Sequence, residues 1–287
     1  MKISELGDEW FRAYELCLRQ YRVKEAAAIA KVYRPEKLYK YFSFNSSHWR
    51  DNAYNGELKF SFPADFNDPL DSRWFLDYEK IYKERFKEIN EEWTIEQFGG
   101  QEFFKNCVHL NEEDLLYLRD LFCICCFSQT PHSNLMWGHY ANKHNGFCLE
   151  YDVSLFSSEL QLVMPVVYTQ KPFDASMILD MRGIDDKYAN LCPSLFKSMD
   201  WSYEKEWRLV LPNMEYKTAP CKSAKGSISG VYFGFRAYSS NRDELEEWAK
   251  NNGIPTYQVE RSYMSFELKS ESIEAMQQTK DHSGLLI

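Results

Sequence analysis

The sequence feature that most constrains the fold is an uninterrupted apolar run from Leu121 to Phe127, which ends at Ser128. A strand with one face in water alternates apolar and polar residues, whereas a strand covered on both faces is apolar throughout. We therefore expect residues 122–128 to form a buried central strand. The section from about 75 to 120 is rich in charge and has helical patterning, and we expect a helical insertion there that covers the sheet.

Helices and strands alternate irregularly along the rest of the chain. Periodicity and turn residues predict strands at 38–42, 58–62, 147–151, 160–168, 204–211, 226–234 and 254–260. The same signals predict helices at 8–32, 48–54, 75–92, 95–109, 111–120, 133–141, 171–180, 186–199 and 241–251. The residues predicted to cap helices are Ser47, Thr94, Ser133 and Asn241.

This order of elements favours an α+β fold over a doubly wound parallel sheet. We expect a single domain with a mixed or antiparallel sheet and helices packed on it. Its length allows one large domain or two small ones. We divide the chain into an N-terminal helical segment at 1–36, one α+β domain at 37–268, and a loose C-terminal tail at 269–287.

The composition narrows the class of protein. The 287 residues carry 34 Lys and Arg against 43 Asp and Glu, a net charge of −9. Such a chain is not expected to coat nucleic acid by charge alone, although a local basic groove stays open. No apolar run predicts a transmembrane helix, and the N-terminus does not resemble a signal peptide. Eight cysteines without repeated C-x-x-C spacing indicate buried reduced thiols in a cytoplasmic protein.

Several catalytic motifs are missing from the sequence. It contains no H-E-x-x-H, no paired C-x-x-C, no G-x-S-x-G and no Walker A pattern. Metal-dependent hydrolysis, serine-hydrolase chemistry and P-loop NTPase activity are therefore disfavoured. His139 and His144 are five residues apart, which is a poor spacing for two metal ligands on one helix.

The strongest local candidate for chemistry is the pair Glu204 and Glu206. In an extended chain, side chains two residues apart point to the same face. Apolar neighbours such as Trp207 can raise the pKa of one carboxylate, while Arg208 can keep the other ionised. The alternative is a strand end with a solvated Glu pair and an ordinary Arg salt bridge.

Four stretches together resemble a family of bacterial proteins known as a domain of unknown function. The resemblance implies a bacterial cytoplasmic protein of a kind sometimes found among phage-defence and toxin-like genes. It implies no reaction. The stretches are Leu38–Tyr41, Phe66–Pro69, the run Cys126–Ser128 with Met136–Ala141 and Gly146-Phe147, and Tyr203–Arg208.

A second resemblance, to ADP-ribosyltransferases, does imply a reaction. That family carries an Arg or His on a first strand, a Ser or Tyr on a later strand, and a Glu, often within Glu/Gln-x-Glu, at the start of a last strand. Lys40 or Tyr41, then Ser128, then Glu204 and Glu206 follow this order. Lys40 departs from the pattern because it stands where the family has Arg or His.

The resemblance implies that NAD is consumed as a substrate. Glu206 would stabilise the positive charge that develops on the ribose, and Glu204 would orient or deprotonate the acceptor. Lys40 and Arg208 would hold phosphates. The other residues implied to form the NAD site are Tyr41, Ser128, Trp137, His139 and Tyr140. The acceptor would be a protein or a nucleic acid, and an antitoxin or defence partner is compatible with this hypothesis.

Two other functions compete with the transferase. One is a non-enzymatic sensor or protein-binding module in which Trp137, Tyr140 and Trp207 form an interface or the core. The other is a nuclease with a metal cluster of Asp68, Asp71 and Glu206. His139 has its own alternative, as a structural hydrogen-bonding residue. None of the hypotheses involves a membrane.

Overall fold

Strand β3 (Phe122–Ser128) lies inside the central sheet, as its apolar sequence predicts. The computed structural model describes residues 9–78, 80, 81, 112–160, 162–180, 188–212 and 218–283. Within these residues the central sheet has eight strands. In spatial order they are β12 (Leu268–Ser272), β11 (Thr256–Arg261), β10 (Ile228–Phe233), β4 (Phe147–Asp152), β1 (Lys37–Phe42), β3, β8 (Glu206–Pro212) and β5 (Val163–Pro165).

Neighbouring strands in this sheet are antiparallel, except that β10 and β11 are parallel. Two short pairs accompany it. Strand β2 (Glu57–Lys59) pairs with β9 (Cys221–Ser223), and β6 (Val167–Thr169) pairs with β7 (Phe196–Ser198). The predicted α+β fold with a mixed sheet is confirmed.

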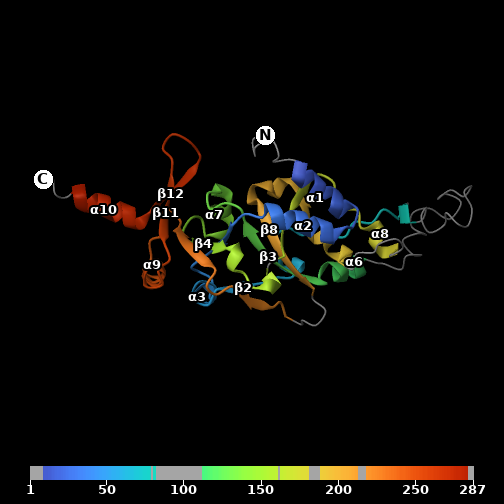
Figure 1. Ribbon diagram of the computed structural model, residues 1–287, viewed down its shortest axis with the longest axis horizontal. Helices are drawn as coiled ribbons and strands as arrows, with labels where there is room; N and C mark the ends of the chain where they lie inside the picture. The colour runs from blue at the N-terminus through green and yellow to red at the C-terminus, as the bar shows by residue number, and fades with distance from the viewer. Residues whose placement is uncertain are drawn as a thin grey trace, which may run out of the picture.

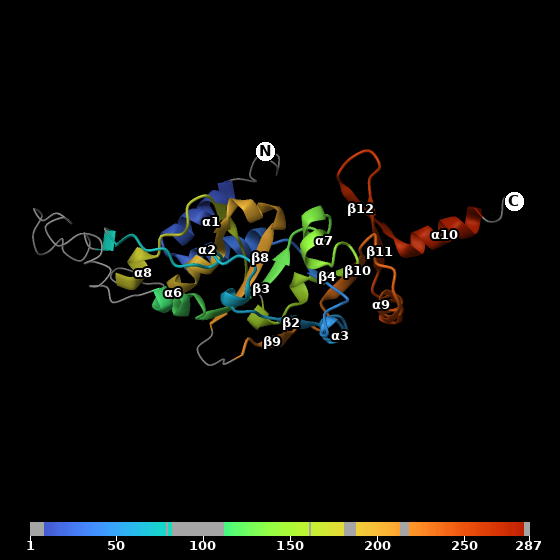
Figure 2. The same cartoon turned by 180° about the vertical axis from the view of Figure 1, so that it is seen from behind.

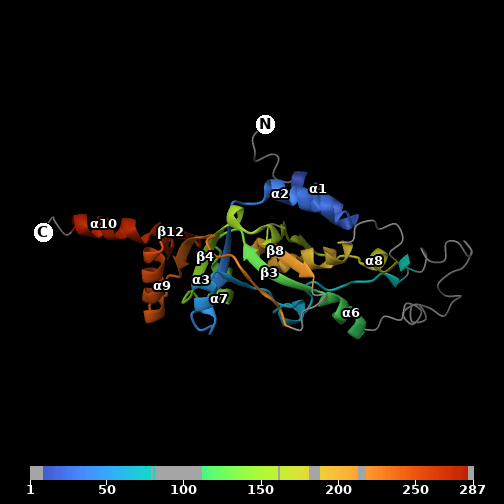
Figure 3. The same cartoon turned by 60° about the horizontal axis from the view of Figure 1, so that its bottom comes forward.

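The helices surround this sheet. The α-helices are α1 (Glu9–Arg19), α2 (Val23–Tyr33), α3 (Trp49–Tyr54), α6 (Glu112–Arg119), α7 (Asn134–Tyr140), α8 (Ser176–Asp180), α9 (Ser240–Asn251) and α10 (Ile273–Ser283). The 3₁₀ helices are η1 (Pro63–Asp65), η3 (Val153–Leu155), η4 (Ser158–Leu160), η5 (Ala189–Leu195) and η6 (Met199–Glu204). Helices α1 and α2 lie together beside β8, while α7 lies beside β4 (Figures 1 and 2). Helix α10 runs away from the body of the sheet (Figure 3).

Side chains from the strands fill two hydrophobic clusters. In β4, Phe147 and Leu149 belong to the larger cluster, whereas Cys148, between them, belongs to the smaller one. Because successive side chains of a strand point to opposite faces, the two clusters lie on opposite faces of β4. Helices α1 and α2 contribute to the larger cluster and α7 to the smaller one. Strand β3 is apolar up to Ser128 because both of its faces are covered.

The N-terminal helix predicted at 8–32 is wrong as a single element. It is divided into α1 and α2 at Tyr21, whose φ of 59° lies in the left-handed region. The turn folds α2 back against α1. Tyr14 of α1 donates a hydrogen bond of 2.7 Å to the carbonyl oxygen of Pro165 at the end of β5, which fixes this pair to the sheet.

Two predicted elements around the site also differ. The strand predicted at 160–168 is divided between β5 and β6, which belong to different sheets. The helix predicted at 186–199 is instead η5 followed by β7, with Pro193 inside η5. Proline has no N–H group and clashes with the preceding turn, which disfavours a continuous α-helix there.

Smaller differences occur at helix ends and at the C-terminus. Helix α8 begins at Ser176 rather than 171, and the residue before α3 is His48 rather than Ser47. Ser239 caps α9 in place of Asn241, whereas Ser133 caps α7 as predicted by accepting a bond from the Met136 N–H. The tail predicted to be loose contains β12 and α10.

The helices predicted at 75–92 and 95–109 fall almost wholly outside the described residues. Helix α6 agrees with the prediction at 111–120. No helix among the described residues is long and apolar enough to cross a bilayer. Cys123 and Cys125 of β3 are buried thiols as predicted, whereas Cys126 is half-buried and Cys221 is exposed, contrary to the prediction.

Strands β1 and β3 separate soon after they meet. Their only paired residues within the described chain are Tyr39 and Ser128. Further along β3, Ile124 instead exchanges backbone hydrogen bonds of 2.9 Å with Ser61, which follows β2. The gap between β1 and β3 is spanned by Lys40, whose Nζ donates to the Cys126 carbonyl oxygen at 2.9 Å.

Candidate functional site

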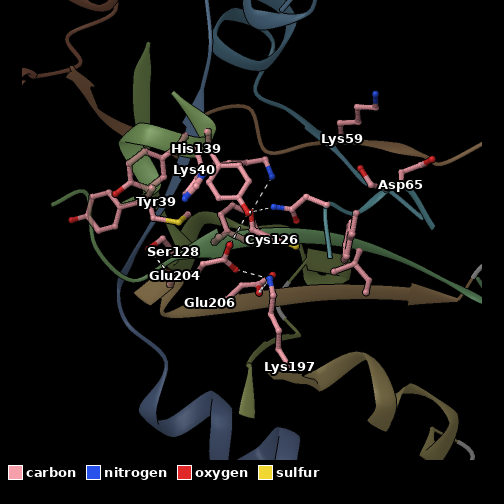
Figure 4. A pocket seen from close by; sticks show the side chains of 18 residues that line it. Tyr39, Lys40, Lys59, Asp65, Cys126, Ser128, His139, Lys197, Glu204 and Glu206 are labelled. Carbon is pink, nitrogen blue, oxygen red and sulfur yellow. Dashed lines mark hydrogen bonds and ion pairs between the residues drawn. The ribbon is translucent and has the colours of Figure 1, made fainter. Parts of the chain in front are cut away.

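A cavity of about 440 Å³ lies where β1 and β3 separate. Side chains from β1, β2, β3, α7 and β7 line it, together with residues that follow β2, the last residue of η6 and the first residue of β8. Figure 4 shows the carboxylates of Glu204 and Glu206 together with the amino group of Lys197 on one side of the cavity. Its volume falls within the range of about 300–1,000 Å³ that is usual for small-molecule sites.

The two glutamates do not share one strand, contrary to the prediction. Glu204 ends η6 and Glu206 begins β8, while Lys205 between them has a φ of 46°. This left-handed residue breaks the extended geometry on which the prediction was based. The predicted result nevertheless holds, because both carboxylates line the same cavity and share one partner.

That partner is Lys197 of β7. Its Nζ lies 2.6 Å from Glu204 Oε2, 3.2 Å from Glu206 Oε2 and 3.3 Å from Asp71 Oδ2. All four residues are buried. Burial alone would favour the neutral amine, but Glu206, Asp71 and Glu204 outweigh it and raise the pKa of Lys197. The lysine is therefore held as a cation among three carboxylates.

Arg208 of β8 completes the cluster. Its guanidinium binds both oxygens of Glu206, at 2.9 and 3.0 Å, and both oxygens of Asp71, at 2.7 and 2.8 Å. It also donates to the Ser194 carbonyl oxygen at 2.7 Å. Arg208 is 0% exposed and does not line the cavity. The expectation that it holds a phosphate is therefore wrong, because its donors are turned toward these buried acceptors.

The two glutamates have opposite pKa shifts. Burial and the neighbouring Glu206 raise the pKa of Glu204 against the pull of Lys197. Burial also acts to raise the pKa of Glu206, but Arg208 and Lys197 outweigh it and hold that pKa at about 2. Glu206 is thus a fixed carboxylate, whereas Glu204 binds a proton more easily than Glu206 does.

Tyr140 of α7 connects Glu204 to the other side of the cavity. Its hydroxyl donates to Glu204 Oε1 at 2.6 Å and accepts a hydrogen bond from Asn67 Nδ2 at 3.3 Å. Burial and the negative charge of Glu204 raise the pKa of Tyr140, so its hydroxyl stays protonated.

Ser128 and Tyr41 line the cavity and are anchored to the backbone. The Ser128 hydroxyl donates to the Glu204 carbonyl oxygen at 2.7 Å. The Tyr41 hydroxyl donates to the Thr130 carbonyl oxygen at 2.7 Å. Both residues are buried, so they shape the wall of the cavity while their donors hold neighbouring loops in place.

Of the three residues expected from α7, two reach the cavity. Tyr140 and His139 line it, and the His139 side chain is at an exposed position with its ring 6.1 Å from that of Tyr203. Trp137 does not. It is 0% exposed, donates to the Pro131 carbonyl oxygen and packs against Tyr41, so it is a core residue rather than a ligand contact.

The cations that line the cavity differ in their partners. Lys197 is neutralised by carboxylates, as described above. Lys40, which is half-buried, and Lys59, which is exposed, have no ion-pair partner among the described residues. These two amino groups are therefore available to an anionic ligand.

The proposed metal cluster of a nuclease does not form. Asp71 and Glu206 do come together, but Arg208 and Lys197 bind their oxygens. The carboxylate of Asp68 instead accepts from the Leu70 N–H at 2.9 Å. No group of three or more His, Cys, Asp or Glu side chains in the described part of the chain is placed to bind a metal ion.

A cysteine nucleophile is also disfavoured. Cys126 lines the cavity next to the cluster. Burial and the negative charge of Glu206 raise its pKa well above the ordinary value. The thiolate is the reactive form of cysteine, so this thiol stays protonated and unreactive at neutral pH.

Sequence reasoning missed Lys197, Asn67 and Lys59, and it placed Asp71 in the wrong kind of site. Lys197 stands directly after the apolar residues Leu195 and Phe196. A lysine in an apolar strand needs a buried anion, and this signal would have identified it. No comparable signal marks Asn67 or Lys59, which reach the cavity through the fold of the segment after α3.

No curated protein and no solved structure matches the chain. The model of one protein family does match part of the chain. The matched part contains most of α7, all of β7 and the start of β8, and it includes Tyr140, Lys197, Glu204 and Glu206. The resemblance to a domain of unknown function is confirmed over this range: residues 136–209 match the protein family of unknown function DUF2971.

Proposed function

We propose that the cavity binds NAD and that the chain transfers its ADP-ribosyl group. One observation carries the proposal. Lys40, Ser128 and Glu206 are far apart in sequence, lie on the neighbouring strands β1, β3 and β8, and line one cavity. Ser128 is directly paired with Glu206 and with Tyr39, the residue next to Lys40.

The opposite pKa shifts assign separate roles to the two carboxylates. Cleavage of the nicotinamide–ribose bond builds positive charge on the sugar, and a fixed negative charge stabilises it where it develops. Glu206, held ionised by Arg208 and Lys197, supplies that charge. Glu204, whose pKa is raised, serves as the base for the acceptor.

The reaction balances without a further reagent. The bond between the ribose carbon and the nicotinamide nitrogen breaks, and nicotinamide leaves with the bonding electron pair. A hydroxyl or amine of the acceptor, or water, forms the new bond to that carbon and releases a proton. Glu204 accepts this proton, and Tyr140, hydrogen-bonded to its Oε1, keeps the carboxylate oriented toward the cavity.

The remaining lining suits a dinucleotide. Lys40 and Lys59 are cations without a carboxylate partner among the described residues, so they can hold the pyrophosphate. The rings of Tyr39, Phe66 and Tyr140 line the cavity and offer stacking surfaces for nicotinamide and adenine. In this proposal the ligand lies with its charge near the lysines and its ribose near the glutamates.

The biological role rests on resemblance alone. Family resemblance supports an effector of a bacterial toxin or phage-defence system that works in the cytoplasm. A protein or a nucleic acid is the acceptor, and water as acceptor would make the protein an NAD glycohydrolase. An antitoxin would be needed to protect the host cell from such an activity.

Nicotinamide release by the purified chain, with and without cell lysate, tests the proposal. Glu206→Gln keeps the shape of the side chain and removes the charge, and we expect release to fall by about 100-fold or more. Glu204→Gln removes the base and should slow transfer by a similar factor, about 100-fold.

Glu150→Gln is the matched control. Glu150 is a hydrogen-bonded carboxylate of β4 that accepts from Tyr39 and Tyr232 and does not line the cavity. Its variant should keep full activity. Circular dichroism and a thermal melt establish that each variant is folded. Equal release by wild type and folded Glu206→Gln would contradict the proposal, and no release by wild type would favour a non-enzymatic binding module.

A further inference from the structure

Strand β12 ends the central sheet. It pairs with β11 on one side, and within the described residues no strand covers its other side. An uncovered edge strand presents a row of backbone donors and acceptors that can bind another strand.

The turn before β12 shows which backbone groups point outward. Ser262 donates to the Glu267 carbonyl oxygen, and the same register continues along the β11–β12 pair. Hydrogen-bonded and non-hydrogen-bonded pairs alternate in an antiparallel ladder. The N–H and C=O groups of Leu268, Ser270 and Ser272 therefore point away from β11, at the outer edge.

The charged residues on this edge are complementary to those on a second, antiparallel copy of the same edge. Lys269 and Glu271 lie on either side of Ser270, and both are exposed. If a second copy of β12 pairs antiparallel about Ser270, Lys269 faces the partner's Glu271, and Glu271 faces the partner's Lys269. Both positions are then non-hydrogen-bonded pairs, in which side chains lie closest. We propose that β12 joins two copies of this chain into a symmetric dimer with one continuous sheet.

The apolar surface next to this edge supports the same partner. Tyr263, Met264 and Phe266 are 96%, 95% and 102% exposed at the tip of the β11–β12 hairpin. A single chain exposes such side chains together only at a cost unless something covers them. In the pairing centred on Ser270, this tip lies beside the start of α10 of the second copy. Helix α10 itself projects away from the body of its own sheet (Figure 3).

Charge reversal tests the register directly. Sedimentation equilibrium of the full chain should show a monomer–dimer equilibrium. Lys269→Glu places Glu opposite Glu at two positions of the interface, and Glu271→Lys places Lys opposite Lys at both. Each variant should therefore raise the dissociation constant of the dimer by roughly tenfold or more. An equimolar mixture of the two variants places Glu against Lys at both positions and should restore the affinity of the wild type.

The mixture also separates the interface from the fold of the single chain. Lys269 is opposite Glu260 within the hairpin, so Lys269→Glu alone can also disturb β11. A disturbed hairpin would not be repaired by mixing, whereas a charge mismatch between copies would. Tyr263→Ser with Phe266→Ser should weaken the dimer and leave the melting temperature of the monomer unchanged, because both side chains are exposed.

Restored affinity in the mixture supports the symmetric β12 interface. A wild-type chain that stays monomeric at all concentrations would overturn it and leave a strand of another protein as the occupant of this edge. A dimer that ignores both charge reversals, or one that the mixture does not restore, would also overturn it.

Discussion

Replacing Lys197 with Met should expose how the buried cluster is balanced. Three carboxylates and two cations meet there, so the formal charge is −1 with all five groups ionised and −2 once Lys197 is removed. Met fills a similar volume without a charge. Removing one partner of a buried ion pair typically costs about 3–5 kcal/mol because the other charge is left uncompensated. We expect a loss of that size in the free energy of unfolding at pH 8.

The loss should shrink as the pH falls. Lys197 acts to lower the pKa of Glu204, so its removal raises that pKa further above the ordinary value. A carboxyl group whose pKa is raised in the folded state contributes stability that is fully present below the ordinary pKa of 4.5 and is lost as the pH rises through the folded pKa. At lower pH the folded variant can therefore reduce its excess negative charge by binding a proton at Glu204. In the wild type Lys197 already balances part of that charge, so proton binding at Glu204 stabilises the wild type less.

Urea denaturation followed by tryptophan fluorescence measures both quantities, at pH 8 and pH 5.5 and at constant ionic strength. Lys40→Met is the matched control, because Lys40 lines the same cavity but has no ion-pair partner among the described residues. It should cost about 1 kcal/mol, the value of its hydrogen bond to the Cys126 carbonyl oxygen. A loss below 1 kcal/mol for Lys197→Met, or one that is equal at both pH values, would refute the reasoning.

Two further predictions concern the same cluster. The wild type should lose about 3 kcal/mol of stability as the pH falls from 4.5 toward 2, because the pKa of Glu206 is held at about 2 and its stabilising charge is lost as the pH falls through that value. The acid denaturation of Glu206→Gln should lack this contribution. Identical acid denaturation profiles for the wild type and the variant would contradict the assignment. Tyr140→Phe removes the donor to Glu204 Oε1 and should lower the free energy of unfolding by about 1 kcal/mol. Under the proposed reaction it should also shift the pH profile of nicotinamide release toward higher pH, since this hydrogen bond acts to lower the pKa of Glu204. An unchanged pH profile would show that Tyr140 takes no part in the reaction.

Local sequence patterns predicted β1 and β3 well, but they predicted a helix where the structure has β7, the strand that carries Lys197. The apolar run of β3 and the capping serine of α7 were identified correctly, because their signals depend on residues a few positions apart. The order Lys40, Ser128 and Glu206 was also enough to predict that these residues meet, although only the structure shows that their strands are neighbours.

The interior of the cluster could not be predicted in the same way. Arg208 was expected to face a ligand, but it binds Asp71, which lies 137 positions earlier in the chain. A pairing over such a distance depends on the whole fold. The left-handed conformation of Lys205 is a second example. A non-glycine residue seldom adopts this conformation, and the lysine side chain gives no sequence signal for it. Trp137 was misassigned because an aromatic residue on a helix face can serve the core or a ligand equally well.

The most direct test of the central claim is the rate at which the purified, folded chain releases nicotinamide from NAD, measured beside Glu206→Gln and Glu150→Gln. The account predicts release by the wild type and by Glu150→Gln, and a rate lower by about 100-fold or more in Glu206→Gln. Release that survives unchanged in folded Glu206→Gln, or that never occurs in the wild type with or without lysate, would contradict it.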